Sequence, residues 1–426
     1  MSGWGRVLGG TLVLLFAAAG LVWWLGVQDA VDVEGADTAT VATPEVLARG
    51  AYLAQAGNCM ACHTRRGEAP YAGGRPIATP FGTVFSSNLT SDRHTGIGSW
   101  SAAHFWRALH HGRSRDGRLL LPVFPYTSTT RVTRDDSDAL WAYLRSLPPV
   151  SRRTEPHQLR WPYSTQWALA IWRALYFRAG VYAPQETRGA DWNRGAYLVQ
   201  GLGHCNACHA PRNLLGASAD AQDLTGGQIP MQGWYAPSLL DPAEAGVATW
   251  DPSHVVQLLQ TGVSPSGSAL GPMAEVVLRS TQYLTQEDLR AMAIYLQTLP
   301  ATARSTGVPE FAPPNTMALG ARVYKRHCAD CHGEGGEGVA RAYPPLAGNR
   351  AVRMENTANL VQVVLRGGFS PATTGNPRPF GMPPFQMLLS DAEVAAVISY
   401  IRKAWGNEAG AVTDLDVAQH RARPMQ

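Results

Sequence analysis

The stretch Cys59-Met60-Ala61-Cys62-His63 returns twice in this chain, with its cysteines and its histidine in place. The later copies are Cys205-Asn206-Ala207-Cys208-His209 and Cys328-Ala329-Asp330-Cys331-His332. Together the three copies use all six cysteines of the sequence, so none remains for a disulfide or a reactive thiol. We therefore take these three stretches as the features around which the fold is organised.

Each Cys-x-x-Cys-His stretch is typical of covalent haem c attachment. Two cysteines at this spacing bond to the two vinyl groups of one haem, and the adjacent histidine becomes the proximal ligand of the iron. A structural zinc site needs four ligands brought together, whereas these pairs lie far apart in the sequence, and a thioredoxin-like dithiol would need a βαβ context that is absent. The sequence therefore predicts three covalently bound haem c groups. The predicted attachment residues are Cys59, Cys62, Cys205, Cys208, Cys328 and Cys331, and the predicted proximal ligands are His63, His209 and His332.

The segments around the three motifs repeat as well. Residues 49–53, 194–198 and 320–324 resemble one another, and each predicts a short helix before its motif. Each unit closes with apolar residues at i, i+3, i+4 and i+7, the pattern of an amphipathic helix. Residues typical of helix N-caps stand before these closing segments; they are Thr133, Thr285 and Ser390.

The repeats predict an all-α chain with three tandem domains, at 45–150, 189–300 and 315–406. Long loops rich in Gly and Pro separate the helices of each unit, and such loops need a reason in a compact domain. A large flat cofactor wrapped by the loops would supply it. Residues 151–188 form a connector rich in aromatic residues, which predicts a packing helix or a docking surface, because Arg173 and Arg178 argue against a membrane span.

The N-terminus contains an uncharged run at 7–27, preceded by Arg6. A transmembrane helix needs about 20 apolar residues, and a basic residue before the run places its start in the cytoplasm. We therefore expect a membrane anchor at 1–28, with the bulk of the chain facing the periplasm from the inner membrane. The alternative is a cleaved signal peptide, whose apolar core is usually shorter.

Two methionines are the favoured candidates for the sixth ligand of a haem iron. A methionine opposite the histidine raises the reduction potential and suits electron transfer. In the third unit we predict Met382, in a Pro-rich loop, with Met387 as the alternative. In the second unit we predict Met273, with Met231 and Met292 as alternatives.

The first unit has no methionine between Cys62 and the end of its closing helix. The position that matches Met382 is Phe124, which cannot bind iron. This haem is then five-coordinate or takes a ligand from elsewhere, and a histidine ligand would lower its potential relative to the other two. The histidines of this unit are His94, His104, His110 and His111, of which His111 is the best candidate.

Charge and motif content exclude several function classes. The formal net charge is only +4 and the basic residues form no long run, so nucleic acid is not an expected partner. The chain contains no dinucleotide fingerprint, no catalytic triad and no second metal-ligand cluster. It is therefore predicted to be a non-catalytic electron carrier. Open alternatives are a free-standing carrier to a terminal oxidase and small-ligand chemistry at a five-coordinate first haem.

Four stretches carry a family resemblance: 195–209, 234–239, 271–276 and 376–385. On these the chain resembles the triheme cytochrome c subunits of bacterial membrane-bound dehydrogenases, those of the alcohol, gluconate or sorbitol, and molybdenum aldehyde or nicotinate types. The resemblance implies three class I cytochrome c domains after a transmembrane helix. It also implies electron transfer from a periplasmic dehydrogenase catalytic subunit to ubiquinone or another acceptor.

The resemblance bears on the sixth ligands too. Met273 and Met382 match the ligand positions of the family. In the first unit the family often has Pro-Ala-Met-Pro-Tyr, where this chain has Pro122-Val123-Phe124-Pro125-Tyr126. The first haem therefore departs from the family pattern.

Overall fold

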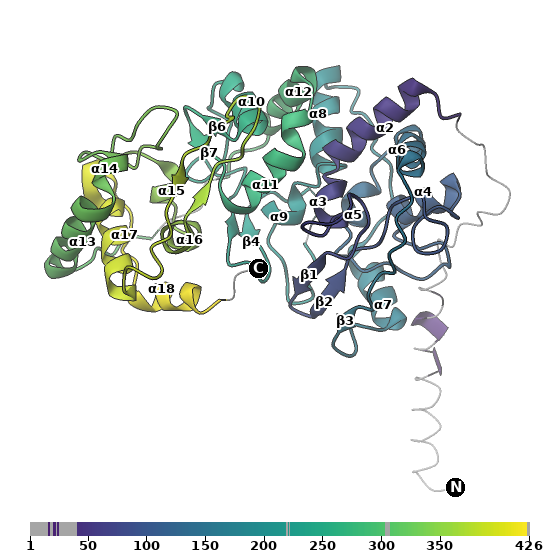
Figure 1. The fold of residues 1–426 in the computed structure, drawn as a ribbon, viewed down its shortest axis with the longest axis horizontal. Helices are drawn as coiled ribbons and strands as arrows, with labels where there is room; N and C mark the ends of the chain where they lie inside the picture. The colour runs from purple at the N-terminus through teal and green to yellow at the C-terminus, as the bar shows by residue number, and fades with distance from the viewer. Residues whose placement is uncertain are drawn as a thin grey trace, which may run out of the picture. The chain divides into compact units, whose positions relative to one another are not determined.

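The computed structural model describes residues 41–218, 220, 222–302 and 307–423, together with residues 16, 17, 20–22 and 24. The chain divides into two compact units. Unit 1 comprises Met1–Ala183, Gln200–His204 and Asn213–Ala221, and unit 2 comprises Pro184–Val199, Cys205–Arg212 and Gln222–Gln426. Figure 1 labels the helices and strands of both.

Unit 1 contains the first Cys-x-x-Cys-His motif and the connector as far as Ala183. Its helices are α2 (Pro44–Ala56), α3 (Cys59–His63), α4 (Ala102–His111), α5 (Tyr126–Thr129), α6 (Arg134–Ser146) and α7 (Gln166–Tyr176). The opening helix α2 packs along the closing helix α6, and Arg49 of α2 binds Asp136 of α6 with 2.6 Å between Nη2 and Oδ1. Thr133 caps α6 as predicted, because its side chain accepts from the N–H of Asp136.

Unit 2 contains the second and third motifs. The helices of the second repeat are α8 (Ala190–Gln200), α9 (Asn206–His209), α10 (Pro252–Thr261), α11 (Gly271–Arg279), the 3₁₀ helix η1 (Thr281–Tyr283) and α12 (Gln286–Gln297). Those of the third are α13 (Pro314–His327), α14 (Ala329–His332), α15 (Arg350–Arg353), α16 (Ala358–Arg366), α17 (Asp391–Lys403), η2 (Ala404–Gly406) and α18 (Asp414–Arg421). Thr285 and Ser390 are the N-caps of α12 and α17, as the sequence predicts.

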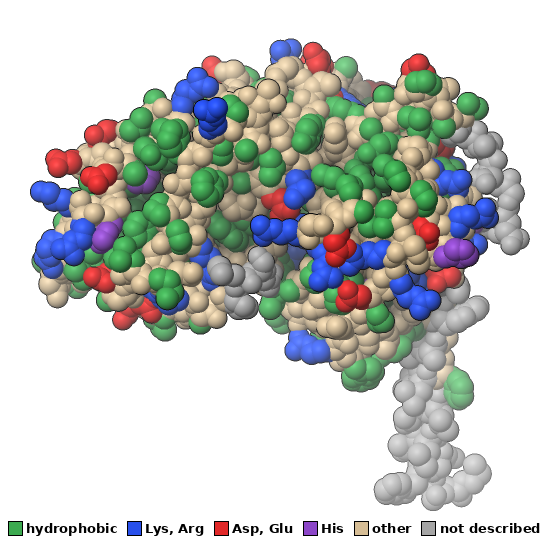
Figure 2. Space-filling model, in the orientation of Figure 1, with side chains coloured by type: hydrophobic (Ala, Val, Ile, Leu, Met, Phe, Trp, Pro, Cys, Tyr) green, Lys and Arg blue, Asp and Glu red, His purple; other side chains and the backbone are tan. Residues whose placement is uncertain are grey.

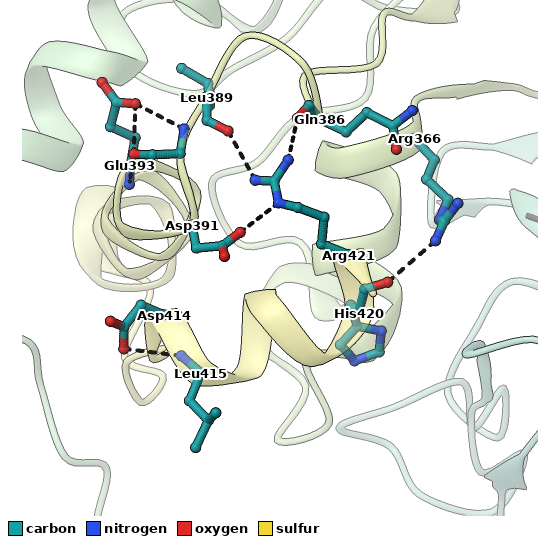
Figure 3. Close-up of polar contacts among 10 residues, drawn as sticks. Arg366, Gln386, Leu389, Asp391, Glu393, Asp414, Leu415, His420 and Arg421 are labelled. Carbon is teal, nitrogen blue, oxygen red and sulfur yellow. Dashed lines mark hydrogen bonds and ion pairs between the residues drawn. The ribbon is translucent and has the colours of Figure 1, made fainter. Parts of the chain in front are cut away.

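The last helix, α18, packs against α16 and α17. Figure 3 shows how Arg421 near its end reaches back to the start of α17. The guanidinium binds Asp391 at 2.6 Å and donates to the carbonyl oxygens of Leu389 and Gln386. Val417 on the inner side of α18 is fully buried in the core of the third repeat. The C-terminal helix thus completes this core.

The prediction of an all-α chain is wrong in one respect, because four small antiparallel sheets occur among the described residues. The three-stranded sheet in unit 1 comprises β1 (Pro76–Thr79), β2 (Gly82–Phe85) and β3 (Gln158–Leu159). Unit 2 has the pairs β4 (Gly227–Gln228) with β5 (Tyr235–Ala236), β6 (Val263–Ser264) with β7 (Gly267–Ser268), and β8 (Gly368–Phe369) with β9 (Gly381–Met382). Strands of two to four residues are too short to show the alternation by which strands are recognised.

The predicted N-terminal transmembrane helix, and the inner-membrane location inferred from it, are corrected by one finding. Within the parts of the chain that the structure describes, no helix is long and apolar enough to cross a membrane. The described residues of the run at 7–27 are 16, 17, 20–22 and 24. Most of the run at 7–27 lies outside the described residues.

Candidate haem attachment sites

Each Cys-x-x-Cys-His motif forms a single helical turn. In α9 the N–H of His209 donates to the carbonyl oxygen of Cys205 at 2.9 Å, and in α14 the N–H of His332 donates to that of Cys328 at 2.9 Å. Residues i, i+3 and i+4 of a helix share one face. The two cysteines and the histidine of each motif therefore point to the same side, which is what attachment to one flat haem requires.

Each of the three histidines makes the same kind of hydrogen bond, from its Nδ1 atom to a main-chain carbonyl oxygen. The Nδ1 atom of His63 lies 2.7 Å from the carbonyl oxygen of Ser87. The Nδ1 atoms of His209 and His332 lie 2.7 Å and 3.0 Å from the carbonyl oxygens of Pro237 and Pro344. A carbonyl oxygen can only accept, so in each case Nδ1 carries the proton and Nε2 presents its lone pair. Histidines that bind a metal are oriented in this way.

Burial keeps these imidazoles neutral. It lowers the pKa of His63, His209 and His332, while the hydrogen bond to the carbonyl oxygen acts in the opposite direction. Neutral imidazole is the form that binds a metal ion. The structure thus presents an uncharged, oriented Nε2 atom at each of the three motifs.

The cysteines fit the same interpretation. All six are free of disulfide bonds. Burial raises the pKa of the Cys59 and Cys205 thiols to about 12 and that of Cys328 to about 11, so these thiols are neutral. Pairs of unoxidised thiols beside an oriented histidine are the donor set that covalent haem c uses, and the residues present fit this group.

The predicted methionine ligands lie in half-buried positions. Met273 is the third residue of α11, and Met382 ends β9 and packs against the core of the third repeat. The alternatives differ, since Met387 is 92% exposed, Met231 is 49% exposed and Met292 is buried in the core. Met273 and Met382 remain predictions.

At the first site the structure places the four histidines in different roles. His94 is exposed. His104 belongs to the capping box at the start of α4, and the Nδ1 atom of the buried His110 binds the carbonyl oxygen of Thr130 at 2.7 Å. His111 is half-buried at the end of α4, and Phe124 is half-buried in the loop before α5. None of the four histidines is identified by its position as the sixth ligand of the first haem.

The carbonyl groups of Ser87, Pro237 and Pro344 were not predicted from the sequence. They follow their histidines by 24, 28 and 12 residues, so no constant spacing could reveal them. Two of the three acceptors belong to prolines, at 237 and 344, and the third belongs to Ser87. Every residue carries a main-chain carbonyl oxygen, so residue type gave no signal either.

Charged side chains of both signs are mixed on one face of the molecule. On the face shown in Figure 2, Lys and Arg side chains lie interspersed with Asp and Glu side chains. Among the described residues, no group of three or more His, Cys, Asp or Glu side chains could hold a separate metal ion. The three motifs are therefore the candidate functional sites in the part of the chain that the structure describes.

Comparison with known proteins gives consistent matches. The family described as Cytochrome c matches residues 47–148 and 317–405. The chain is 38% identical over 408 residues to the protein named alcohol dehydrogenase (quinone), cytochrome c subunit, of Gluconacetobacter polyoxogenes, covering 91% of this chain and 87% of that one. It is 38% identical over 401 residues to the gluconate 2-dehydrogenase cytochrome c subunit of Pantoea cypripedii, covering 89% and 90%. It is also 33% identical over 409 residues to the fructose dehydrogenase cytochrome subunit of Gluconobacter japonicus, covering 89% and 83%.

Proposed function

We propose a function that proceeds from one premise: this chain belongs to the family of cytochrome c subunits of dehydrogenases. As a member it carries covalently bound haem c and transfers electrons from a dehydrogenase. We infer further that it holds three haem c groups, one at each motif. It receives electrons from a separate catalytic dehydrogenase subunit and passes them to ubiquinone or another acceptor.

One observation carries the proposal of three haems. The arrangement of a histidine Nδ1 atom on a main-chain carbonyl oxygen, beside two free cysteines, occurs at 63, 209 and 332 alike. Haem iron, when bound, supplies the one-electron redox chemistry. The protein's part is to orient each imidazole and to keep it neutral.

The sixth ligands make the three sites unequal. We propose that Met273 and Met382 bind the second and third irons, in keeping with their half-buried positions and with the exposure of Met231 and Met387. Thioether ligation raises the reduction potential. With Phe124 in the matching place, the first site has no thioether, so we propose that its haem has the lowest potential of the three.

The haem count is tested by intact-protein mass and by haem absorbance in alkaline pyridine, set against the protein concentration. We expect three haems per chain. A variant that combines Cys205→Ser and Cys208→Ser is the matched control and should carry two. A wild-type chain with fewer than three haems contradicts the proposal.

The donor and the acceptor need separate experiments. Affinity purification of this chain from its source should retain a dehydrogenase catalytic subunit in fixed ratio, and recovery of the chain alone contradicts the role as a subunit. The alcohol dehydrogenase relatives are named as quinone enzymes, which supports a quinone as acceptor. Stopped-flow mixing of the reduced complex with a short-chain ubiquinone should reoxidise the haems, and failure to do so excludes ubiquinone.

A further inference from the structure

The segment Gly233 to Pro237 in unit 2 touches the second motif directly. Its last residue supplies the carbonyl oxygen that accepts from Nδ1 of His209 at 2.7 Å. Residues 233, 235 and 236 are buried, so the segment is part of the packed interior. The position of Pro237, and with it the strength of the bond to His209, depends on what holds this segment.

A helix of the third repeat is hydrogen-bonded to this segment, Gly233 to Pro237. The side chain of Asn359, on α16, accepts from the N–H of Tyr235 at 2.8 Å and donates to the carbonyl oxygen of Tyr235 at 2.7 Å. One amide side chain thus satisfies both main-chain groups of a residue that lies 124 positions away in the sequence. Gln362, one turn further along α16, is 1% exposed and adds a longer contact to the carbonyl oxygen of Gly233 at 3.4 Å.

The other side of the segment is fixed within the second repeat. The hydroxyl of Tyr235 binds Oε2 of Glu244 at 2.9 Å, and the same oxygen accepts from the N–H of Ser238 at 2.6 Å. All three residues are buried. Glu244 and Asn359 therefore hold Tyr235 from two sides and restrict the movement of its main chain and its side chain.

The segment also contacts the start of α11, the helix that contains the predicted sixth ligand. A β-carbon on Gly271 would come within 2.7 Å of the Trp234 ring, so the indole packs directly on the main chain there. Gly271 begins α11, and Met273 is two residues further on. Both predicted axial ligands of the second haem, His209 and Met273, are therefore next to groups that the same segment supports.

We propose that Asn359 is a positioning residue for the second haem. By fixing Tyr235, Asn359 holds the Pro237 carbonyl oxygen against His209. A helix of the third repeat thereby sets the reduction potential of the second haem. The inference rests on the proposed function for the presence of that haem. The hydrogen bond that Nδ1 donates makes the imidazole a stronger electron donor to a metal bound at Nε2. A stronger donor favours the oxidised iron, so loosening that bond raises the reduction potential.

The test is Asn359→Ala in the full-length haem-loaded protein, followed by a redox titration of the visible haem spectrum. The midpoint potential of the second haem should shift upward, while the midpoint potentials of the other two haems should not change. The shifted component is identified as the one that is missing from the variant combining Cys205→Ser and Cys208→Ser. Should Asn359→Ala not accumulate, Asn359→Ser leaves only a short hydroxyl at the site and carries the same prediction.

A control and a second measurement separate this role from general loosening. Asn356 lies two residues before the same helix, where its side chain accepts from the N–H of Ala358 at 3.1 Å. Asn356→Ala should leave all three potentials unchanged. In Asn359→Ala, amide hydrogen exchange across 233–238 should be about tenfold faster or more, as expected from the loss of two ordinary hydrogen bonds.

Two outcomes overturn the role of Asn359. One is that all three midpoint potentials are unchanged in an Asn359→Ala protein that carries three haems and whose amide hydrogens at 233–238 exchange faster. The other is an equal shift in Asn356→Ala, which assigns the effect to α16 as a whole. A wild-type chain with fewer than three haems is a different result, because it contradicts the proposed function itself.

Discussion

Gly195 of α8 lies directly against the main-chain carbonyl of Ala291 in α12, where a β-carbon would overlap the carbonyl oxygen. The same relationship joins Gly50 with Ala139 and Gly320 with Ala396. A tyrosine of the closing helix borders each glycine; the three are Tyr143, Tyr295 and Tyr400. The opening and closing helices of every repeat therefore cross at a point that only glycine permits.

A methyl group at this crossing should destabilise the repeat. We expect Gly195→Ala to lower the free energy of unfolding by about 1–3 kcal/mol, the usual cost of overpacking. Thermal unfolding followed by circular dichroism measures it. The control is Gly189→Ala just before α8, where a β-carbon meets nothing within 4 Å. Equal stability of the two variants would show that the crossing is not tight.

The ion pair between Arg194 and Asp288 should contribute measurably to stability. The guanidinium makes two bonds of 2.7 Å to the carboxylate, whose side chain is 11% exposed. Since the Arg194 side chain is 36% exposed, solvent weakens the pair, and we expect Asp288→Asn to cost about 1–2 kcal/mol. Asp116→Asn, at the exposed pair with Arg118, is the control and should have almost no effect on chemical denaturation.

The missing thioether at the first haem should be visible in ligand binding. Because Phe124 cannot bind iron, we expect the reduced protein to bind one carbon monoxide per chain, at the first haem. Phe124→Met should abolish this binding and raise the lowest midpoint potential. Difference spectra with carbon monoxide and a redox titration measure the two effects.

His111 provides the contrasting experiment. If its side chain were the sixth ligand, the wild-type protein would bind no carbon monoxide and His111→Gln would create a binding site. We expect instead that His111→Gln leaves the stoichiometry at one per chain. A wild-type protein without carbon monoxide binding therefore contradicts a five-coordinate first haem.

His110 should make unit 1 sensitive to mild acid. Burial lowers its pKa below the ordinary value of 6.5, and the nearby Arg173 acts in the same direction, while the bond to the Thr130 carbonyl opposes them. The unfolded chain therefore binds more protons at this residue than the folded chain does. Stability should fall as the pH drops below about 6.5 and stay constant at this residue above it.

The measurement is urea denaturation at several pH values between neutral and acid. His110→Gln should reduce the loss of stability in acid, because the side chain no longer takes up a proton on unfolding. Trp106, stacked on the His110 ring, and the neighbouring His111 remain in both proteins. The exposed His94 gives the control variant, His94→Gln. An unchanged pH profile in His110→Gln would assign the acid sensitivity elsewhere.

The sequence by itself determined the features that are encoded within a few residues. Cys-x-x-Cys-His identifies an attachment site because one helical turn is enough to align its three side chains. Thr133, Thr285 and Ser390 were recognisable as N-caps because the cap bonds to the main chain three residues on. Resemblance among the repeats then indicated three helical units.

Other parts of the site were decided only by the tertiary structure. The carbonyl oxygens that orient His63, His209 and His332 come from loops at unequal distances along the chain, and the strands are too short to show a pattern. The bonds between Asn359 and Tyr235 join residues from two repeats. Such contacts follow from how helices and loops pack around a site, and a hydrogen bond between distant residues leaves no periodic trace in the sequence.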